Sequence, residues 1–430
     1  MKGSLSSVLP PKIVLGIVAL ACLASPASAL TPHATLAYSR DAAEFLKHYH
    51  AEAIRTPDNF VHRKFALMSD SPIGFFRGSA HLFYRDLSEH PALKSPVIIP
   101  LVGDVHLENV SAFKLSRGLG TFDLDDFDEA VEGPYTWEVL RVLVSIRLFA
   151  REANFSKAAT ERIVNRFLSG YLTRLEDFSK NPGTLKSPVV ESMVPGPAAG
   201  AIQRVNKQNL LKERKRWIRG GRIVRKKKLI PVNFQTMKGL HVSIEAYAEQ
   251  RHEPVGFFRV KDAVRRVAGL ASLSKQRFLL LVEGKSAADS DDFLLELKEQ
   301  SASAAVPYLS ARPGNQAERV RKAWEYFVPD ADQFLGTASA GDSHYLVRSF
   351  PLLRSEVDVD TLETELEFSQ FIDTVALLVT RAHARSGRGR DILNDAGGIS
   401  AITKRLSGFS EAYARQIESD REIWKTYIDP

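Results

Sequence analysis

The chain has 430 residues, of which 44% are apolar and 25% charged. This length exceeds one compact core of ordinary size, so we expect two or more lobes. The 58 Lys and Arg residues outnumber the 51 Asp and Glu residues, and the net charge is +7. A charge this mild argues against a dedicated nucleic-acid coat but permits local anion binding. No nucleic-acid partner is expected.

The first 29 residues have the pattern of a secretory signal peptide. Lys2 and Lys12 precede an apolar run at 13–24, and Ala-Ser-Ala follows at 27–29. The run is too short to span a bilayer, and the small residues suit a cleavage site. We therefore predict an exported protein, periplasmic or secreted. The alternative is an uncleaved helix that anchors the chain to a membrane.

The single cysteine, Cys22, lies inside this leader. The mature chain is therefore predicted to contain no disulfide, and a core of this size supplies stability without one. The preceding Ala-Leu-Ala at 19–21 also gives Cys22 some likeness to the acceptor cysteine of bacterial lipoproteins. Any membrane contact is expected only through such a lipid.

Residues 39–95 are predicted to be mainly helical, with one amphipathic helix at 42–54. Within this segment Phe-Phe-Arg-Gly at 75–78 places Arg77 directly after two aromatic rings. Arg77 either reaches a phosphate through its planar guanidinium or caps a loop over the aromatic pair. The Val- and Ile-rich run at 96–102 is then predicted to be a buried strand.

The stretch that follows this strand carries the densest set of polar ligands in the chain. It reads Gly-Asp-Val-His-Leu-Glu-Asn at 103–109 and Phe-Asp-Leu-Asp-Asp-Phe-Asp-Glu at 122–129. Between them, 116–120 has the composition of a hairpin turn. A hairpin would fold the second acidic stretch beside the first.

The rest of the chain is predicted to alternate between helical and strand-rich parts. A helix from Tyr135 to 149 is apolar on nearly every face and should lie inside a helical lobe. The basic segment 212–228 is interpreted as a solvated helix and turn, with an anion-binding surface as the alternative. Further expected elements are a helix at 157–178, a loop at 181–200, strands at 264–273, 276–282, 292–297 and 344–350, and helices at 316–327, 359–383 and 399–427.

Phosphoryl transfer needs a carboxylate that orients the attacking hydroxyl, oxygen ligands that hold Mg²⁺, and a lysine for the phosphates. Asp104, Asn109 and Asp123 supply the first two requirements. Clustered carboxylates repel one another unless a cation lies among them, which favours a functional reading of this set. His106 is interpreted as orienting the loop, and Asp128 with Glu129 as capping the next segment.

These motifs resemble the aminoglycoside and choline kinase branch of the protein-kinase-like fold. Residues 103–109 match its catalytic-loop pattern Gly-Asp-x-His-x-x-Asn. Phe122-Asp123 with Asp126, and then Gly-Pro and Trp-Glu at 133–138, resemble its metal-binding segment, with Glu138 in place of an aspartate. In that fold the nucleotide lobe precedes the catalytic loop, whereas its candidates here follow it.

The resemblance therefore implies an α+β, two-lobed, circularly permuted kinase-like fold, with a mainly helical larger lobe and a small antiparallel-sheet lobe. It implies a nucleotide and a hydroxyl-bearing substrate as partners, and ATP and Mg²⁺ as cofactors. The implied site residues are Asp104 as general base, Lys298 on the phosphates and Glu318 as the partner of Lys298. Asn109, Asp123 and Asp126 are implied as metal ligands, with Asp125 as an alternative to Asp126. Gly269 is the single glycine of the implied phosphate hairpin.

The whole chain also resembles a bacterial family known as domain of unknown function 2252. The features are Phe-Arg-Gly at 76–78, the two acidic stretches, Leu-Lys-Glu at 297–299 and Ala-His-Ala-Arg-Ser-Gly at 382–387. The expected division is a signal peptide at 1–29, an N-terminal helical segment at 30–95, the catalytic part at 96–230, a β-rich nucleotide-lobe-like region at 231–352 and C-terminal helices at 353–430.

Two other functions fit the same residues. Asp104 and His106, with the aspartates nearby, resemble part of a site for two divalent ions, which indicates a metal-dependent phosphoesterase. A catalytically silent ligand-binding protein on a kinase-like scaffold is the third reading. The hairpin around Gly269 favours this last reading. A backbone approaches phosphates most closely where several glycines occur, and this hairpin has only one.

Overall fold

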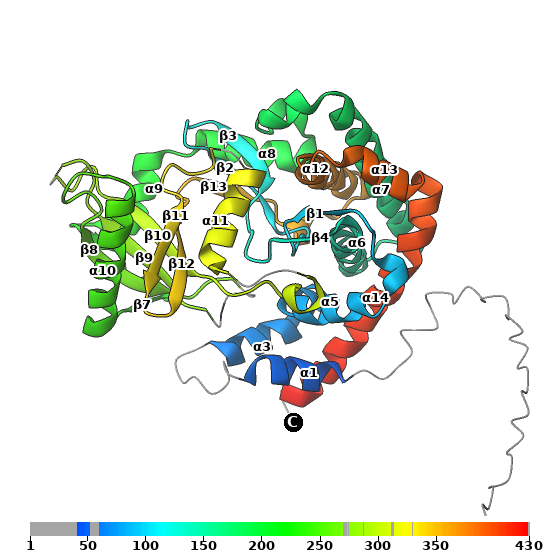
Figure 1. The fold of residues 1–430 in the computed structure, drawn as a ribbon, viewed down its shortest axis with the longest axis horizontal. Coiled ribbons are helices and arrows are strands. Elements are labelled where there is room, and N and C mark those ends of the chain that lie inside the picture. The colour runs from blue at the N-terminus through cyan, green and yellow to red at the C-terminus, as the bar shows by residue number, and fades with distance from the viewer. Residues whose placement is uncertain are drawn as a thin grey trace, which may run out of the picture.

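The structure is a computed structural model that describes residues 41–51, 60–269, 273, 275–286, 288–310, 314–328 and 330–428. The predicted signal peptide and Cys22 lie outside these residues. The described chain forms a mixed α and β structure with antiparallel sheets. Figure 1 shows a sheet region on one side, formed by residues 218–350, and a mainly helical region on the other.

The sheet region is built on six antiparallel strands in the order β11-β12-β10-β9-β8-β7. Helix α10 (Phe234–Gln250) covers one face of this sheet, where Leu240, Ile244 and Tyr247 pack against it. The strands are β7 (Leu229–Pro231), β8 (Val260–Arg266), β9 (Arg277–Val282), β10 (Phe293–Glu299), β11 (Gly336–Ala340) and β12 (Ser343–Ser349).

Alternation along β10 sorts its side chains between the two faces. Leu295 and Leu297 join the core under α10, whereas Leu294 faces the opposite side. By the same alternation Glu296 and Lys298 share the face of Leu294. The short hairpin of β5 (Ile218–Arg219) and β6 (Arg222–Ile223) packs on that opposite face.

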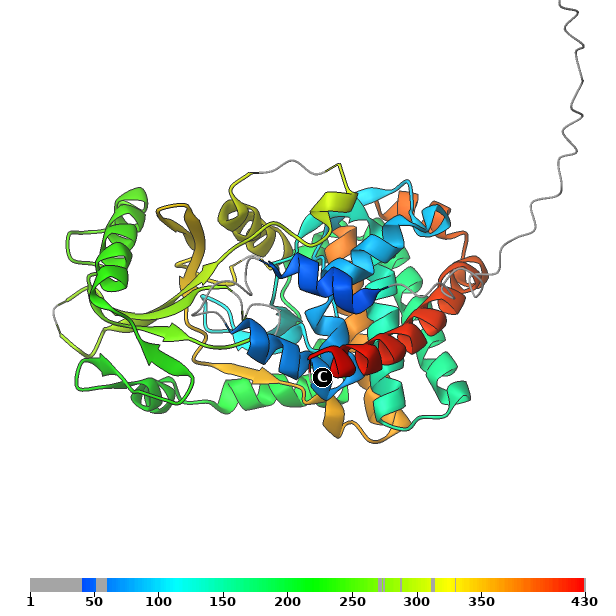
Figure 2. The same cartoon turned by 90° about the horizontal axis from the view of Figure 1, so that it is seen from below.

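The helical region is assembled from both ends of the described chain. Figure 2 shows the C-terminal helix α14 running beside the N-terminal helices α1 and α3. Its principal helices are α1 (Ala42–Tyr49), α3 (Val61–Asp70), α4 (Pro72–Gly78), α5 (Ala80–Ser88), α6 (Tyr135–Glu152), α7 (Lys157–Lys180), α8 (Gly196–Lys207), α12 (Glu365–Ala384), α13 (Gly389–Ala396) and α14 (Ile399–Ile428). Helix α9 (Leu210–Trp217) lies with the sheet region.

Two small sheets position the polar stretches within this region. Strands β1 (Ile98–Leu101) and β4 (Val131–Pro134) pair with each other, and β2 (Val110–Lys114) pairs with both β3 (Gly120–Leu124) and β13 (Arg354–Glu356). Helix α11 (Gln316–Phe327) connects β10 to β11 and lies between the sheet and these strands. The loops after β1 and β3 therefore face the sheet region.

Most predicted elements are present, although several differ in their bounds; the helix expected at 359–383 is α12, which begins at Glu365. The hairpin at 116–120 and the helix from Tyr135 are confirmed. The strand expected at 264–273 is β8, which begins four residues earlier and ends at Arg266. The loop expected at 181–200 contains two 3-10 turns and the start of α8, whose Pro197 lies in the first turn, where proline fits a helix.

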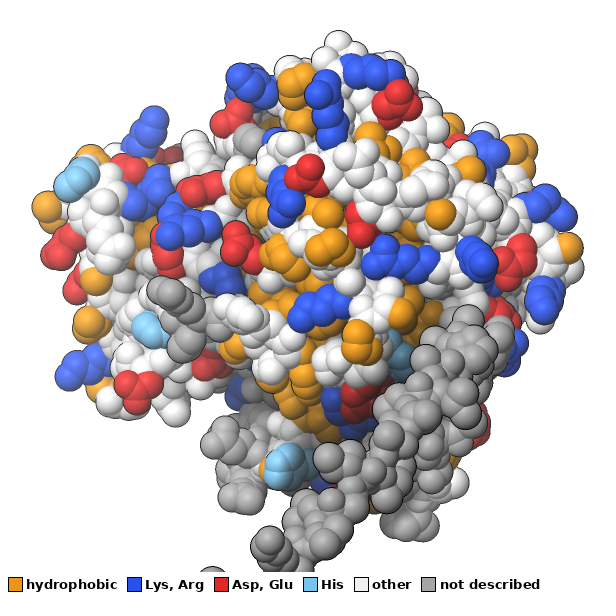
Figure 3. Space-filling view, turned by 45° about the vertical axis from the view of Figure 1, so that its right-hand side comes forward, with side chains coloured by type: hydrophobic (Ala, Val, Ile, Leu, Met, Phe, Trp, Pro, Cys, Tyr) orange, Lys and Arg blue, Asp and Glu red, His pale blue; other side chains and the backbone are white. Residues whose placement is uncertain are grey.

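No described helix combines the length and the apolar character that a membrane crossing requires. The surface of the described chain carries charges of both signs. Figure 3 shows basic and acidic side chains interspersed over one face, with apolar side chains gathered in its middle. This distribution agrees with the mild net charge.

Candidate functional site

The loop after β1 begins at Gly103, where only glycine fits. Its φ is +96°, and a Cβ at this position would lie 1.9 Å from the carbonyl oxygen of Glu129. Its N–H donates to Oε1 of Glu138 on α6 at 2.7 Å. The loop is thus held between α6 and the last residue of the second acidic stretch.

Asp104 is buried, and its carboxylate is paired with an arginine from α6. The Nε of Arg141 donates to Oδ1 of Asp104 at 2.7 Å, and the Arg141 side chain is fully buried. Burial raises the pKa of Asp104 to about 6, although the Arg141 charge opposes this rise. The negative charges of Glu129 and Asp126 add to it. A carboxyl with this pKa changes its charge just below neutral pH.

Asn109 closes the loop and joins the two acidic stretches. Its Nδ2 donates to the carbonyl oxygen of Asp104 at 2.6 Å. The backbone carbonyl of Asn109 accepts from the N–H of Asp125 at 3.3 Å, at the end of the β2–β3 hairpin. The hairpin therefore brings the second acidic stretch beside the first, as the sequence predicted.

Lys298 meets this second stretch from the sheet region. Its Nζ lies 2.6 Å from Oδ2 of Asp128 and 3.1 Å from Oδ1 of Asp126. Burial alone would raise the pKa of Asp126, but the Lys298 ammonium outweighs it and holds that pKa below its usual range. The Lys298 side chain is only 7% exposed, whereas that of Asp126 is 41% exposed. Asp126 is thus the carboxylate that solvent reaches.

Glu296 precedes Lys298 by two residues and is fully buried among arginines. Its carboxylate oxygens lie 2.6 Å from Nη1 of Arg266, 3.3 Å from Nε of Arg277 and 3.1 Å from Nη2 of Arg348. Burial would raise the pKa of Glu296, but these guanidinium groups hold it well below its usual range. This cluster occupies the sheet face next to Lys298.

Asp123 lies on β3 and not in the cluster around Lys298. Its Oδ1 accepts from the N–H of Leu124 at 2.9 Å. Burial raises its pKa to about 6, while the charges of Arg381 and Arg385 at the end of α12 oppose the rise. Of the three residues expected on the metal, Asn109 bonds Asp125, the residue before Asp126, and Asp123 faces α12.

Three other predicted contacts need correction or qualification. Glu318 does not pair with Lys298, since its partners are Arg321 and Lys322 on its own helix. Arg77 contacts the loop through Glu108 at 2.7 Å. Gly269 has φ +79°, as a turn glycine does, but residues 270–272 of the predicted hairpin lie outside the described part.

The residue that connects α11 to the site is Arg319, next to Glu318. Its guanidinium donates to the carbonyl oxygens of Ala130 and Asp128 at 2.5 and 2.7 Å. An arginine bonded to loop carbonyls has no signature in a single sequence, so Arg319 was not predicted.

His106 and the two acids expected to act as caps have more specific roles. The Nδ1 of His106 accepts from the N–H of Glu108 at 3.2 Å, so the ring orients the loop as an acceptor. Burial lowers its pKa well below the usual value, and the ring is neutral. Glu129 accepts from the N–H of Ala304 at 2.5 Å, which is 175 residues away, so it does not cap the segment that follows it. Asp128 instead binds Lys298, which corrects the prediction.

Sequence reasoning missed the buried charges that support the loop. Arg141 lies in a buried and mainly apolar helix, and a charge there requires a partner. Glu138 bonds the loop through Gly103 and also lies 2.8 Å from Nε2 of His383 on α12. The other ring nitrogen of His383 lies 2.7 Å from the hydroxyl of Tyr171. The signal for these pairs was the occurrence of ionisable residues in apolar helices.

The donor set near Asp126 suits a magnesium ion. Mg²⁺ prefers oxygen ligands and keeps several waters, so one carboxylate and one amide oxygen suffice. Asp126 is partly exposed, and Asn109 uses only its amide nitrogen in the loop. Among the residues that the structure describes, no group of three metal-type side chains occurs. Asp126 and Asn109 are thus the residues that could hold one hydrated Mg²⁺.

The chain belongs to the family described as "Uncharacterized protein conserved in bacteria (DUF2252)", whose family model matches residues 55–428. This membership confirms the family resemblance drawn from the motifs. No curated protein and no solved structure matches the chain.

Proposed function

We propose that the protein is a kinase-like phosphotransferase that moves the γ-phosphoryl group of Mg-ATP to a hydroxyl of a small molecule or protein. One observation carries the proposal: Lys298, on a central strand of the sheet, meets Asp126 just beyond the hairpin that follows the Asp104–Asn109 loop. Phosphoryl transfer needs a base, an oxygen ligand for Mg²⁺ and a lysine in this proximity.

The order of elements supports the same proposal. Strands β8, β9 and β10 are followed by α11 and then by the hairpin β11–β12, with β12 next to β10. The resembled fold has this succession of hairpin, lysine strand, helix and hinge strand. The chain after α12 then returns to β1, where Arg388 donates to the carbonyl oxygen of Ile98 at 3.1 Å. The end of α12 thus lies beside the strand that leads to Asp104, as a circular permutation requires.

The roles follow from the contacts. Asp104 accepts the proton of the acceptor hydroxyl as its oxygen attacks the γ-phosphorus, and the bond from that phosphorus to the β–γ bridging oxygen breaks to release ADP. Asn109 and Asp126 would hold the Mg²⁺ that neutralises the phosphates. Lys298 then exchanges its bonds to Asp126 and Asp128 for bonds to phosphate oxygens. Arg141 holds the Asp104 carboxylate in position.

A second candidate is a silent ligand-binding protein on the same scaffold. The observation that favours it is that every charge of the site already has a partner inside the protein. Asp104 is paired with Arg141, Lys298 with two aspartates and Glu296 with three arginines. Binding without turnover would distinguish this candidate from the first.

Calorimetric titration with Mg-ATP tests the proposal. We expect the wild type to bind, and Lys298→Ala to weaken binding by at least about tenfold, because a charge-assisted bond to phosphate contributes roughly 1.5–3 kcal/mol. Lys261→Ala is the matched control, since Lys261 lies on β8 and pairs with Asp289 and Asp292 away from the site. No heat of binding at millimolar Mg-ATP would refute the proposal.

A further inference from the structure

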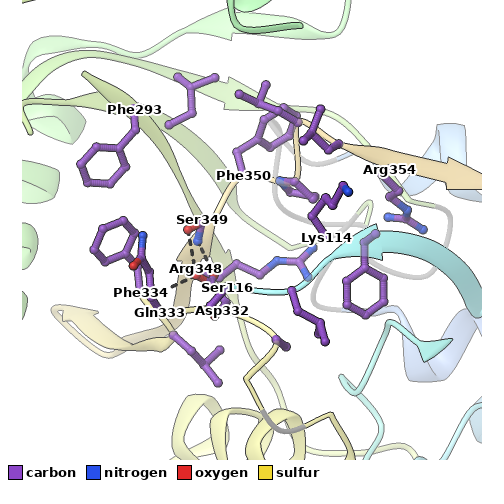
Figure 4. A pocket seen from close by; sticks show the side chains of 18 of the residues that line it. Lys114, Ser116, Phe293, Asp332, Gln333, Phe334, Arg348, Ser349, Phe350 and Arg354 are labelled. Atoms are coloured by element: carbon purple, nitrogen blue, oxygen red, sulfur yellow. Dashed lines mark hydrogen bonds between the residues drawn. The ribbon is translucent and has the colours of Figure 1, made fainter. Parts of the chain in front are cut away.

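A cavity of about 640 Å³ lies where the linker from β12 to β13 passes between the sheet region and the β2–β3 hairpin. This volume is in the range of small-molecule sites. Figure 4 shows Phe293 and Phe334 at one side of the cavity and Lys114 and Arg354 at the other. The cavity therefore has an apolar end and a cationic end.

The apolar end is an aromatic cluster. The rings of Phe293 and Phe334 stack with their centroids 4.7 Å apart, and Phe257 lies 5.8 and 6.1 Å from them. All three line the cavity, together with Trp324 and Phe350. Such a surface suits a chain or ring without polar groups.

Two of the three aspartates that line the cavity, Asp125 and Asp332, already have partners, whereas Oδ1 of Asp291 is buried without one among the described residues. Asp332 accepts from Ser349, through both its N–H and its hydroxyl, and from the N–H of Phe334. Asp125 accepts from the hydroxyl of Ser111 at 2.5 Å and pairs with Arg354 at 2.5 Å. A ligand gains little by offering donors to these two carboxylates.

Donors remain available as well, although Nη2 of Arg354 is already paired with Asp125 and Glu356. The Nε of Arg354 is buried without a hydrogen-bond partner among the described residues. The Nζ of Lys114 bonds only an amide oxygen, that of Asn206 at 2.8 Å, and forms no ion pair within the described chain. Buried donors without acceptors are costly unless a ligand or water supplies the acceptor. The cationic end is therefore suited to an anion.

This cavity is distinct from the proposed phosphotransfer site. Its lining includes neither Asp104 nor Lys298 nor Asp126. Two ion pairs, Arg348 with Glu296 and Arg354 with Asp125, lie between the two places. Glu296 stands two residues before Lys298, and Asp125 directly precedes Asp126. A ligand that bonds these arginines would therefore change the charges next to Lys298 and Asp126.

We propose that this cavity binds an amphipathic monoanion, with a carboxylate at Lys114 and Arg354 and an apolar chain or ring on the phenylalanine cluster. This proposal does not depend on the phosphotransfer activity, because its test measures binding alone.

The test is calorimetric titration of the full chain with three ten-carbon probes that differ in the head group: decanoate, decanol and decyltrimethylammonium. We expect decanoate to bind at least about tenfold tighter than the other two, the gain of one charge-assisted hydrogen bond. Lys114→Gln should remove most of this preference, because glutamine retains a polar contact to Asn206 without the charge. Phe334→Ala should weaken all three probes.

Arg166→Gln serves as the control, since Arg166 is exposed and pairs with Asp373 in the helical region. Equal affinity for the three head groups, or no binding by any, would overturn the proposal. Displacement of decanoate by Mg-ATP, with loss of decanoate binding in Lys298→Ala, would also overturn it by placing the cavity within the nucleotide site. Decanoate binding that persists while Mg-ATP fails to bind would separate this proposal from the proposed function.

Discussion

At the scale of single residues, two opposing effects set the chemistry of Asp104. Burial favours the neutral carboxyl, whereas Arg141 at 2.7 Å favours the carboxylate, and burial wins by enough to bring the pKa to about 6. A base must be deprotonated to accept a proton, and its strength rises with its pKa. Asp104 is thus a stronger base than an exposed aspartate and is still mostly ionised at neutral pH.

The first prediction concerns this titration. Transfer activity should rise with pH through a midpoint of about 6, because only the ionised form of Asp104 accepts the hydroxyl proton. Arg141→Met should move the midpoint upward, since the opposing positive charge is lost. The measurement is kcat against pH for both proteins. An unchanged midpoint in Arg141→Met would contradict the prediction.

The second prediction concerns the buried cluster around Glu296. Glu296→Gln removes the charge that neutralises Arg266, Arg277 and Arg348, and we expect a loss of about 3–5 kcal/mol in the free energy of unfolding. Glu132→Gln, at an exposed strand position of β4, should change it by less than about 0.5 kcal/mol. Urea unfolding followed by circular dichroism measures both. Equal losses would contradict the prediction that the three arginines depend on the Glu296 charge.

At the scale of elements, the turn between β1 and the Asp104 loop is the most constrained position of the site. Gly103 combines a positive φ with backbone contact, whereas Gly118 in the β2–β3 turn has φ +78° and open space around its Cβ position. Adding a Cβ at Gly118 therefore costs only the backbone strain of a positive φ, whereas adding one at Gly103 costs this strain and a steric clash as well.

The third prediction uses this pair. Gly118→Ala should cost about 1–2 kcal/mol, the strain of a left-handed conformation with a Cβ. Gly103→Ala should cost at least about 2 kcal/mol more, because its Cβ cannot occupy the position of the Glu129 carbonyl. Thermal unfolding of the two variants measures the difference. Similar values for both would contradict the described contact.

Elements were predictable from the sequence where local patterns decide them. The apolar helix from Tyr135 and the hairpin at 116–120 are examples, since turn residues and hydrophobic periodicity act over a few positions. The contact of Lys298 with Asp126 joins residues 172 positions apart, and only the family resemblance pointed to Lys298. Asp128 and Arg319 could not be predicted, because their roles depend on where α11 and β10 pack.

At the scale of the whole molecule, buried carboxyls make stability depend on pH. Asp104 and Asp123 both have a pKa raised to about 6, so the folded chain holds protons that the unfolded chain releases near pH 4. Their contribution to stability is therefore fully present below about pH 4 and is lost as pH rises through 6. Asp126 and Glu296, whose pKa values are lowered, act in the opposite sense.

The fourth prediction isolates one of these groups. Between pH 4 and pH 7 the stability of the wild type should fall relative to that of Asp123→Asn by up to about 3 kcal/mol, the equivalent of the two-unit rise in pKa. The measurement is the urea midpoint of both proteins across this range. Parallel curves would show that Asp123 is not protonated in the folded state at these pH values.

The assembly of the helical region from both chain ends has a consequence for synthesis on the ribosome. Arg147 of α6 is fully buried, and its partners Ser410 and Glu411 at 2.9 Å belong to α14. The sheet region between them enters and leaves at nearby points, since the rings of Trp217 and Phe350 lie 4.6 Å apart. The sheet region can thus fold as it emerges, whereas the face of α6 that packs on α14 stays uncovered until the last helix is made, with Arg147 paired only to Glu161 of α7. The nascent chain is most exposed to misassembly and chaperone capture during this interval.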